Sequence, residues 1–252
     1  MLKNKLSILI ITKNNEDILE NALKSIKSLK AEIIIVDTKS TDKTLSIARK
    51  YTSYIYNFSD RNISKKRNFA LTKATSDWIL ILDADEQISS ELSGEIKKIL
   101  KSYSKFNSYN IKFKSHLFGK RLRYGGENYT MQRLIKRKYI YITNDLVHEK
   151  YLSKSGKVGV LKGAINHFSY RSLFQMYSKF TRYALNDAKQ KSKSGEKTSL
   201  KKIFIYPIHM FWARFIKDEG YKDGLIRIPL DLGFAYMEFI TYLFIPFFKI
   251  FK

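Results

Sequence analysis

The chain has 252 residues, 44% of them hydrophobic, so it can bury a substantial core and is too apolar to be a disordered polymer. It contains no cysteine, which excludes disulfides and thiolate metal sites. The net charge of +24 is concentrated in the middle, where residues 101–200 hold 22 Lys and Arg against 5 Asp and Glu. Such a surface attracts nucleic acid, an anionic bilayer or a phosphorylated glycolipid, unless the lysines only decorate a solvated face.

Residues 1–102 alternate strand-like with helix-like segments. Short apolar runs predict strands at 6–11, 32–36, 54–58 and 78–82. Apolar residues at helical spacing predict helices over 18–29, 41–48, 64–74 and 89–100. This order predicts an α/β fold with a mostly parallel sheet and helices on both faces.

The pattern changes after residue 103. Strands are predicted at 109–113 and 129–135, on either side of a basic, glycine-containing loop at 119–126. The polar, charged stretch 187–199 is typical of a mobile linker. Residues 201–252 hold 14 of the 36 aromatic residues, interleaved with lysine and arginine. We expect helices there that lie in a bilayer interface, or that pack on the body or on a second subunit.

The most informative motif is Asp83-Ala84-Asp85, directly after the apolar run 78–82. In an extended backbone, positions 83 and 85 point to the same side. Two carboxylates would therefore converge outside the carboxyl end of a buried strand, where open α/β sheets bind ligands. Carboxylate oxygens in this arrangement suit Mg²⁺ or Mn²⁺ carrying a phosphorylated substrate.

Two other predicted strands also end in polar residues. Because parallel strands share one edge of a sheet, these residues should lie close to Asp83 and Asp85. An aspartate there can accept hydrogen bonds from a base or ribose, and capping of the next helix is its alternative role. The polar residues are Thr12, Asn14 and Asn15 after the first run, and Asp37 and Ser40 after the second.

These motifs resemble the family 2 glycosyltransferases of the GT-A fold. The resemblance is carried, in order and spacing, by Thr12-Lys13-Asn14, residues 35–44, residues 66–70 and residues 82–86. It extends more loosely through Val147-His148-Glu149, Asn166-His167-Phe168 and residues 220–224, a longer pattern similar to that of bacterial lipopolysaccharide-core glucosyltransferases. One departure is Asn14-Asn15, where family members usually carry Asn-Glu.

The resemblance implies a role for each matching residue. Nucleotide-sugar binding would fall to Thr12, Asn14, Asn15, Asp37, Ser40, Arg67, Asn68, Asp83 and Ala84. Mg²⁺ or Mn²⁺ would be held by Asp85, Asp83 and His167, although a lone histidine is more often structural. Glu149 would be the base of an inverting transfer, with His148 as the competing base and an exposed surface pair as the alternative for both.

The resemblance also implies a domain division and a reaction. Residues 1–185 would form the GT-A catalytic domain, with a nucleotide-binding half at 1–102 and an acceptor half at 103–185. A mobile linker at 186–200 would lead to a helical, membrane-associating or oligomerising region at 201–252. The reaction would be an inverting, metal-dependent transfer of glucose from UDP-glucose to a lipopolysaccharide core or similar anionic glycolipid.

Other functions and partners are compatible with parts of the sequence. Sugar transfer to a polyprenyl phosphate or a capsule repeat unit is the alternative reaction. Nucleic-acid binding rests on charge alone, no recognition motif supports it, and we expect no nucleic-acid partner. The apolar run at 6–11 is too short for a signal-peptide core. We therefore expect a cytoplasmic protein, peripheral on the inner face of the cytoplasmic membrane, with a homodimer through the C-terminal helices as one arrangement of residues 201–252.

Overall fold

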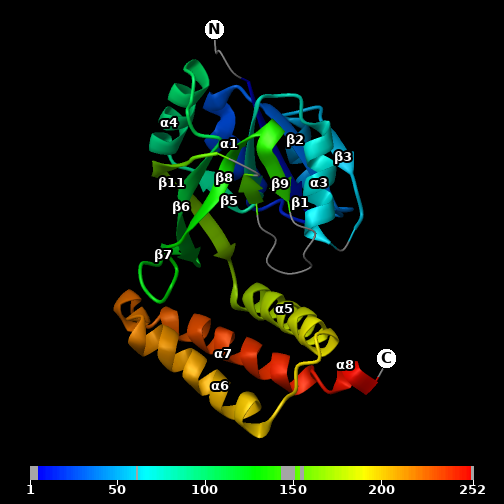
Figure 1. Cartoon of the computed structure of the whole chain (residues 1–252), viewed down its shortest axis with the longest axis vertical. Coiled ribbons are helices and arrows are strands. Elements are labelled where there is room, and N and C mark those ends of the chain that lie inside the picture. Colours follow the sequence, from blue (N-terminus) through cyan, green and yellow to red (C-terminus); the bar gives the residue numbers. More distant parts are fainter. Residues whose placement is uncertain (1–4, 61, 143–150, 154–155, 251–252) are drawn as a thin grey trace. The chain divides into compact units, whose positions relative to one another are not determined.

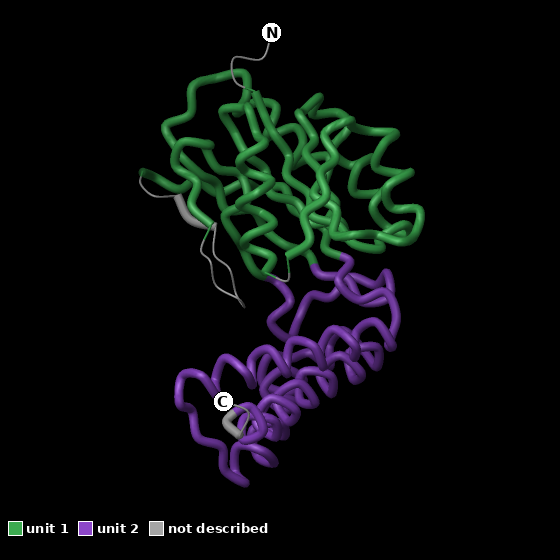
Figure 2. The backbone as a smooth tube through the Cα atoms, turned by 90° about the vertical axis from the view of Figure 1, so that its right-hand side faces the viewer, with its two compact units in different colours: residues 1–114, 129–167 green, residues 115–128, 168–252 purple. Residues whose placement is uncertain are grey.

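The structure is a computed structural model that describes residues 5–60, 62–142, 151–153 and 156–250 (Figure 1). The chain forms two compact units (Figure 2). Unit 1 comprises residues 1–114 and 129–167, and unit 2 comprises 115–128 and 168–252. This division differs from the predicted boundary at residue 185, because the loop 115–128 and the helix after residue 172 both pack with the C-terminal helices.

Unit 1 is built around a mixed sheet with the strand order β3-β2-β1-β4-β8-β6-β11-β5. The first four strands in that order are parallel, and β8 pairs antiparallel with both β4 and β6. The strands are β1 (Leu6–Thr12), β2 (Glu32–Asp37), β3 (Ile55–Asn57), β4 (Trp78–Asp83), β5 (Glu86–Ile88), β6 (Ser108–Leu117), β8 (Thr130–Lys136) and β11 (Val158–Tyr170). A separate two-stranded ladder joins β9 (Ile140–Ile142) to β10 (Tyr151–Ser153).

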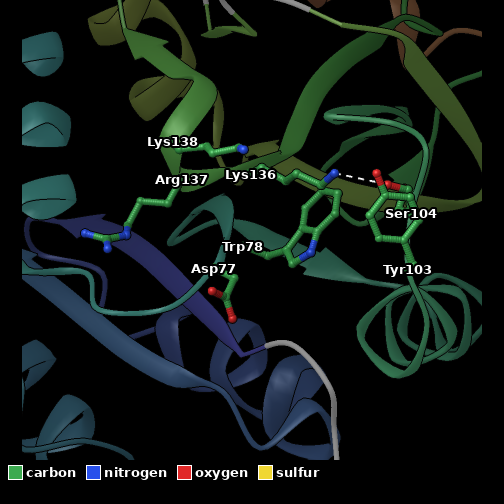
Figure 3. A pocket seen from close by; sticks show the side chains of 7 residues that line it. All are labelled: Asp77, Trp78, Tyr103, Ser104, Lys136, Arg137 and Lys138. Carbon is green, nitrogen blue, oxygen red and sulfur yellow. Dashed lines mark hydrogen bonds between the residues drawn. The ribbon is translucent and has the colours of Figure 1, made fainter.

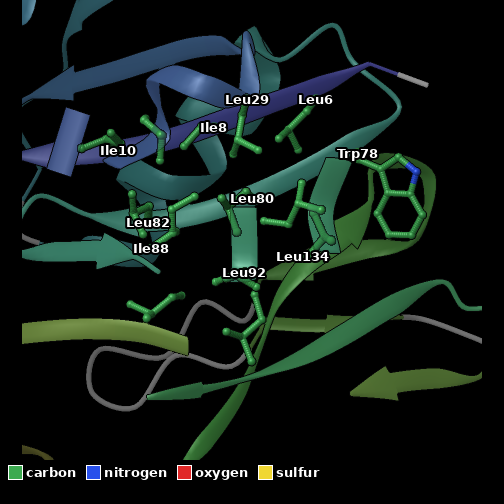
Figure 4. Close-up of a cluster of buried hydrophobic side chains, with 14 of the residues drawn as sticks. Leu6, Ile8, Ile10, Leu29, Trp78, Leu80, Leu82, Ile88, Leu92 and Leu134 are labelled. Atoms are coloured by element: carbon green, nitrogen blue, oxygen red, sulfur yellow. The ribbon is translucent and has the colours of Figure 1, made fainter. Parts of the chain in front are cut away.

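Helices cover both faces of this sheet, as predicted. Successive strand residues point to opposite sides, so Ile8 and Ile10 join one buried cluster while Leu9 joins another. The first cluster (Figure 4) includes side chains from α1 (Leu19–Ile26), η1 (Lys27–Leu29), α2 (Thr44–Arg49) and α4 (Ser90–Lys101). The second packs against α3 (Ile63–Lys73). Each fully buried Leu or Ile contributes about 1.5–3 kcal/mol to folding, so the two clusters hold the strand ends rigidly.

Unit 2 consists mainly of α5 (Leu173–Lys193), α6 (Leu200–Trp212) and α7 (Arg227–Phe244), and α7 packs against both of the others. Its smaller elements are β7 (Lys120–Arg121), the π-helical turn η3 (Ala213–Lys217), η4 (Gly220–Asp223) and α8 (Phe247–Ile250). Across the described residues, none of the helices combines the length and hydropathy needed to span a membrane.

The predicted linker at 186–200 differs from the structure, because α5 continues to Lys193. Ala184, Ala188 and Ser192 are buried at a spacing of four residues, which gives the polar stretch one small, buried stripe. Burial of this stripe explains why a sequence rich in exposed lysine is nevertheless helical. The connection from α5 to α6 is therefore only residues 194–199.

Candidate functional site

The carboxyl ends of three neighbouring strands meet in register. Thr12 at the end of β1 pairs with Asp37 at the end of β2, and Ile11 pairs with Asp83 at the end of β4. The β1–β2 and β1–β4 pairs are both parallel, so the carboxyl ends of all three strands lie at the same edge of the sheet. The structure thus brings together the strand-end residues that the sequence singles out.

The loops after β1 and β2 are linked by side-chain hydrogen bonds. The Asp37 carboxylate, which is buried, accepts hydrogen bonds from the backbone N–H of Ser40 at 2.9 Å and from its hydroxyl at 2.5 Å. The backbone N–H of Asn14 donates to the same hydroxyl at 2.9 Å. Asn15 Nδ2 donates to the Thr12 hydroxyl at 3.2 Å. These contacts give both loops a fixed shape around Asp37.

Asp83 lies in a network of two arginines and a second carboxylate. Arg67 Nη2, from α3, is 2.5 Å from Asp83 Oδ1. Arg133 Nη2, from β8, is 2.9 Å from Glu86 Oε1 and 3.5 Å from Asp83 Oδ2. The Glu86 carboxylate also accepts the backbone N–H of Asp83 at 2.8 Å. Arg67, Arg133 and Glu86 are buried, so this network fixes the direction of the Asp83 side chain.

The two acids of this network have opposite pKa shifts. Burial by itself raises the pKa of Asp83, but the guanidinium groups of Arg67 and Arg133 outweigh it and hold that pKa well below its usual range. Burial raises the pKa of Glu86 to about 8, with the charge of Asp83 adding to the effect and Arg133 opposing it. Asp83 is therefore an anion in the folded protein, and its carboxylate is ion-paired with Arg67 and Arg133.

Asp85 lies beside His167. The antiparallel pairing of β5 with β11 sets His167 opposite Glu86, one residue from Asp85. His167 Nε2 is 3.6 Å from Asp85 Oδ1, and the two side chains are 21% and 17% exposed. Adjacent ligands of an octahedral cation with bonds of about 2.1 Å lie about 3 Å apart, so this pair is close to the required spacing.

The donor set fits a divalent cation that is only partly held by protein. Among the described residues, three His, Asp or Glu side chains do not converge into a complete metal site. Mg²⁺ usually binds one or two carboxylates and takes its other ligands from phosphate and water, which Asp85 and His167 leave room for. Asp83 is the least suited of the predicted ligands because Arg67 contacts its Oδ1.

Four predicted site residues remain to be located. Asn68 is half-buried on α3 beside Arg67, and Ala84 is buried between the two aspartates. Glu149 and His148 lie outside the described residues. Sequence analysis does not identify Arg133 and Glu86 as site residues. The available signal was weak: an arginine at position 133, directly before Leu134 and Ile135, within the predicted strand 129–135.

A cavity of about 600 Å³ lies at the opposite, amino-terminal end of β4 (Figure 3). Lys136 Nζ reaches across it to donate to the Ser104 carbonyl at 3.0 Å, between the rings of Trp78 and Tyr103. None of the predicted site residues lines this cavity, which is bordered by Asp77, Trp78, Tyr103, Ser104, Lys136, Arg137 and Lys138.

Comparisons with known sequences agree with one another. The family model described as "Glycosyl transferase family 2" matches residues 7–160. An uncharacterized glycosyltransferase of Rickettsia bellii is 30% identical over 251 residues, covering 95% of this chain and 85% of that protein. The lipopolysaccharide core biosynthesis glycosyltransferase LpsC of Rhizobium meliloti is 26% identical over 249 residues, covering 95% and 91%.

Solved structures confirm the predicted fold class. Residues 1–349 of S. aureus TarS superpose with a TM-score of 0.52 at 16% identity, covering 98% of this chain and 92% of that one. The mannosyltransferase PcManGT from Pyrobaculum calidifontis, in complex with GDP-Man and Mn²⁺, gives a TM-score of 0.50 at 15% identity, covering 94% and 74%. At these identities the likeness shows the fold alone, which is that of the GT-A glycosyltransferases.

Proposed function

Because the chain belongs to glycosyl transferase family 2, we propose that it transfers glucose from UDP-glucose to a lipopolysaccharide core or similar anionic glycolipid. The proposal is carried by the convergence of Thr12, Asp37 and Asp83 at one edge of the sheet, with Asp85 and His167 beside them. The similarity to LpsC, which is named for lipopolysaccharide core biosynthesis, supports this class of acceptor. A polyprenyl phosphate or capsule unit is the alternative acceptor.

In this proposal the residues gathered at this edge of the sheet have separate roles. Asp37 accepts hydrogen bonds from the base or ribose, and Arg67 presents a guanidinium to the diphosphate while Asp83 holds it in place. Asp85 and His167 hold Mg²⁺ or Mn²⁺. Such a cation neutralises charge on the departing nucleoside diphosphate.

The acceptor hydroxyl must lose its proton as it attacks the anomeric carbon from the face opposite the leaving group. An inverting transfer needs one base for this step. Glu149 is the proposed base and His148 its competitor.

The donor is tested by a ligand panel on the intact protein. UDP-glucose with Mn²⁺ should raise the melting temperature, because a ligand at about 100 times its Kd stabilises the native state by about 2.7 kcal/mol. EDTA should remove the shift, and GDP-mannose should produce a smaller one. If no nucleotide sugar stabilises the protein with or without Mn²⁺, the proposed function is wrong.

We further propose that helix α6 places the enzyme on an anionic membrane surface. None of its described side chains is buried, and Phe204, Ile208 and Trp212 recur every fourth residue at 56%, 65% and 47% exposure. Lys201 and Lys217 are exposed near the two ends of this stripe. An apolar, aromatic helix face with flanking cations is suited to the interface of an anionic bilayer.

The double variant Ile208→Glu, Trp212→Glu should therefore weaken binding to phosphatidylglycerol vesicles at least tenfold in a flotation assay, while phosphatidylcholine vesicles bind poorly throughout. Val160→Glu, at a residue 72% exposed on β11 in unit 1, is the matched control and should bind as wild type. If the double variant floats with the vesicles normally but loses a dimer in light scattering, the α6 face is a subunit interface and the membrane proposal is wrong.

A further inference from the structure

We propose that Tyr129 is a positioning residue that keeps Nε2 of His167 available to a divalent cation beside Asp85, an inference that rests on the proposed function. Tyr129 directly precedes β8, and its hydroxyl oxygen lies 3.3 Å from Nδ1 of His167. The other ring nitrogen, Nε2, faces Asp85 Oδ1 at 3.6 Å. The hydroxyl and the carboxylate thus lie at opposite nitrogens of one imidazole ring.

The Tyr129 ring is held by packing within unit 1. It stacks on the fully buried ring of Phe113, with centroids 4.8 Å apart and an interplanar angle of 12°. The backbone N–H of Phe113 donates to the Tyr129 carbonyl at 2.8 Å. Phe113 also meets His167 edge-on, at 6.1 Å and 82°. One phenylalanine therefore contacts both rings, and the stacked Tyr129 ring directs its hydroxyl at His167.

The proton on the imidazole explains why a hydroxyl is needed at this position. A neutral histidine has one N–H donor and one acceptor nitrogen. When Nδ1 accepts a hydrogen bond from the Tyr129 hydroxyl, the proton of the neutral ring is on Nε2, which faces the Asp85 carboxylate. A cation requires the lone pair of Nε2, so the proton must lie on Nδ1, where it is donated to the Tyr129 oxygen. Because a tyrosine hydroxyl can donate or accept, His167 keeps this partner in both tautomers.

Tyr129→Phe tests this role, because it retains the stacked ring and removes only the hydroxyl. The Kd for Mn²⁺ in the presence of saturating UDP, measured from the EPR signal of free Mn²⁺, should rise about 10–100-fold. The melting temperature in EDTA should not change. The matched control is Tyr109→Phe, near the amino-terminal end of β6. It removes a hydroxyl 2.8 Å from Ser104 Oγ and should leave the Mn²⁺ Kd as in wild type.

A double-mutant cycle separates this role from a structural one. His167→Ala should weaken Mn²⁺ binding, and adding Tyr129→Phe to it should have no further effect, since the hydroxyl acts through the imidazole. If wild type binds Mn²⁺ and Tyr129→Phe binds it equally tightly, or if the two substitutions weaken binding independently, the positioning role is wrong. If wild type binds no Mn²⁺ together with UDP, the metal site in the proposed function is wrong instead.

Discussion

Asp85→Asn is expected to reduce sugar transfer about a thousandfold. Asparagine keeps the size of the side chain but lacks the charge that holds a divalent cation beside His167. Neutralising the departing diphosphate supplies several kcal/mol of transition-state stabilisation, and each 1.4 kcal/mol changes the rate tenfold. The measurement is the transfer of radiolabelled glucose from UDP-glucose to a lipopolysaccharide-core acceptor, over a titration of Mn²⁺.

The control for this experiment is Asp77→Asn, at an exposed aspartate just before the amino-terminal end of β4. Its carboxylate accepts the backbone N–H of Lys5 at 3.0 Å, far along the strand from Asp83. Transfer by this variant should equal that of wild type. If the folded Asp85→Asn protein transfers glucose at the normal rate with the same response to Mn²⁺, the metal-assisted mechanism is wrong.

The parallel half of the sheet could be predicted from the sequence in detail. In this half each strand is a short apolar run, and the residue that ends it is polar, as with Thr12, Asp37 and Asp83. Parallel strands joined by helices leave little choice of register, because the helices must cover both faces. The order of the segments therefore predicts that these three ends are neighbours, and the structure places them so.

The antiparallel half could not be predicted in the same way. Arg133 reaches Glu86 because β8 pairs with β4, and His167 reaches Asp85 because β11 pairs with β5. These pairings join residues 40 or more positions apart, and an alternating pattern does not say which strand is the partner. Tyr129 has a role only after both pairings are known, so no local signal identifies it.

Unit 2 contains a buried ionic cluster that links the glycine-containing loop to the helices. Arg227, which is fully buried, donates to the carbonyls of Tyr124 at 3.1 Å and Gly125 at 2.7 Å. Arg227 Nε also lies 2.9 Å from Asp231 Oδ2, and Arg214 Nε lies 3.0 Å from Asp231 Oδ1. The sequence indicates both the basic loop and the motif at 220–224, but not that they meet. The remaining members of the cluster are Glu127, bonded to Arg214, and Asp223, which accepts the backbone N–H groups of Arg123 and Tyr124.

Asp231→Ala is therefore expected to destabilise unit 2 by about 3 kcal/mol, the lower end of the cost of breaking a buried ion pair, because Glu127 remains beside both arginines. Both Arg214 and Arg227 would lose a carboxylate, and Arg227 has no access to water. The chain has two tryptophans, Trp78 in unit 1 and Trp212 in unit 2, so ¹⁹F spectra of fluorotryptophan-labelled protein follow each unit separately in urea. The unfolding transition that the Trp212 signal reports should occur at a lower urea concentration than in wild type.

The matched control is Asp187→Ala, which breaks an ion pair of 3.2 Å with Lys191 on α5 of the same unit. That pair is partly exposed and spans one helical turn, so its loss should cost at most about 0.5 kcal/mol. If the two substitutions lower the free energy of unfolding by amounts that differ by several kcal/mol, burial of the ion pair, rather than ion pairing as such, makes the loop depend on α7. If both variants unfold at the urea concentration of wild type, Asp231 does not hold the glycine-containing loop on α7, and the other contacts of the loop, including those with Asp223, are sufficient.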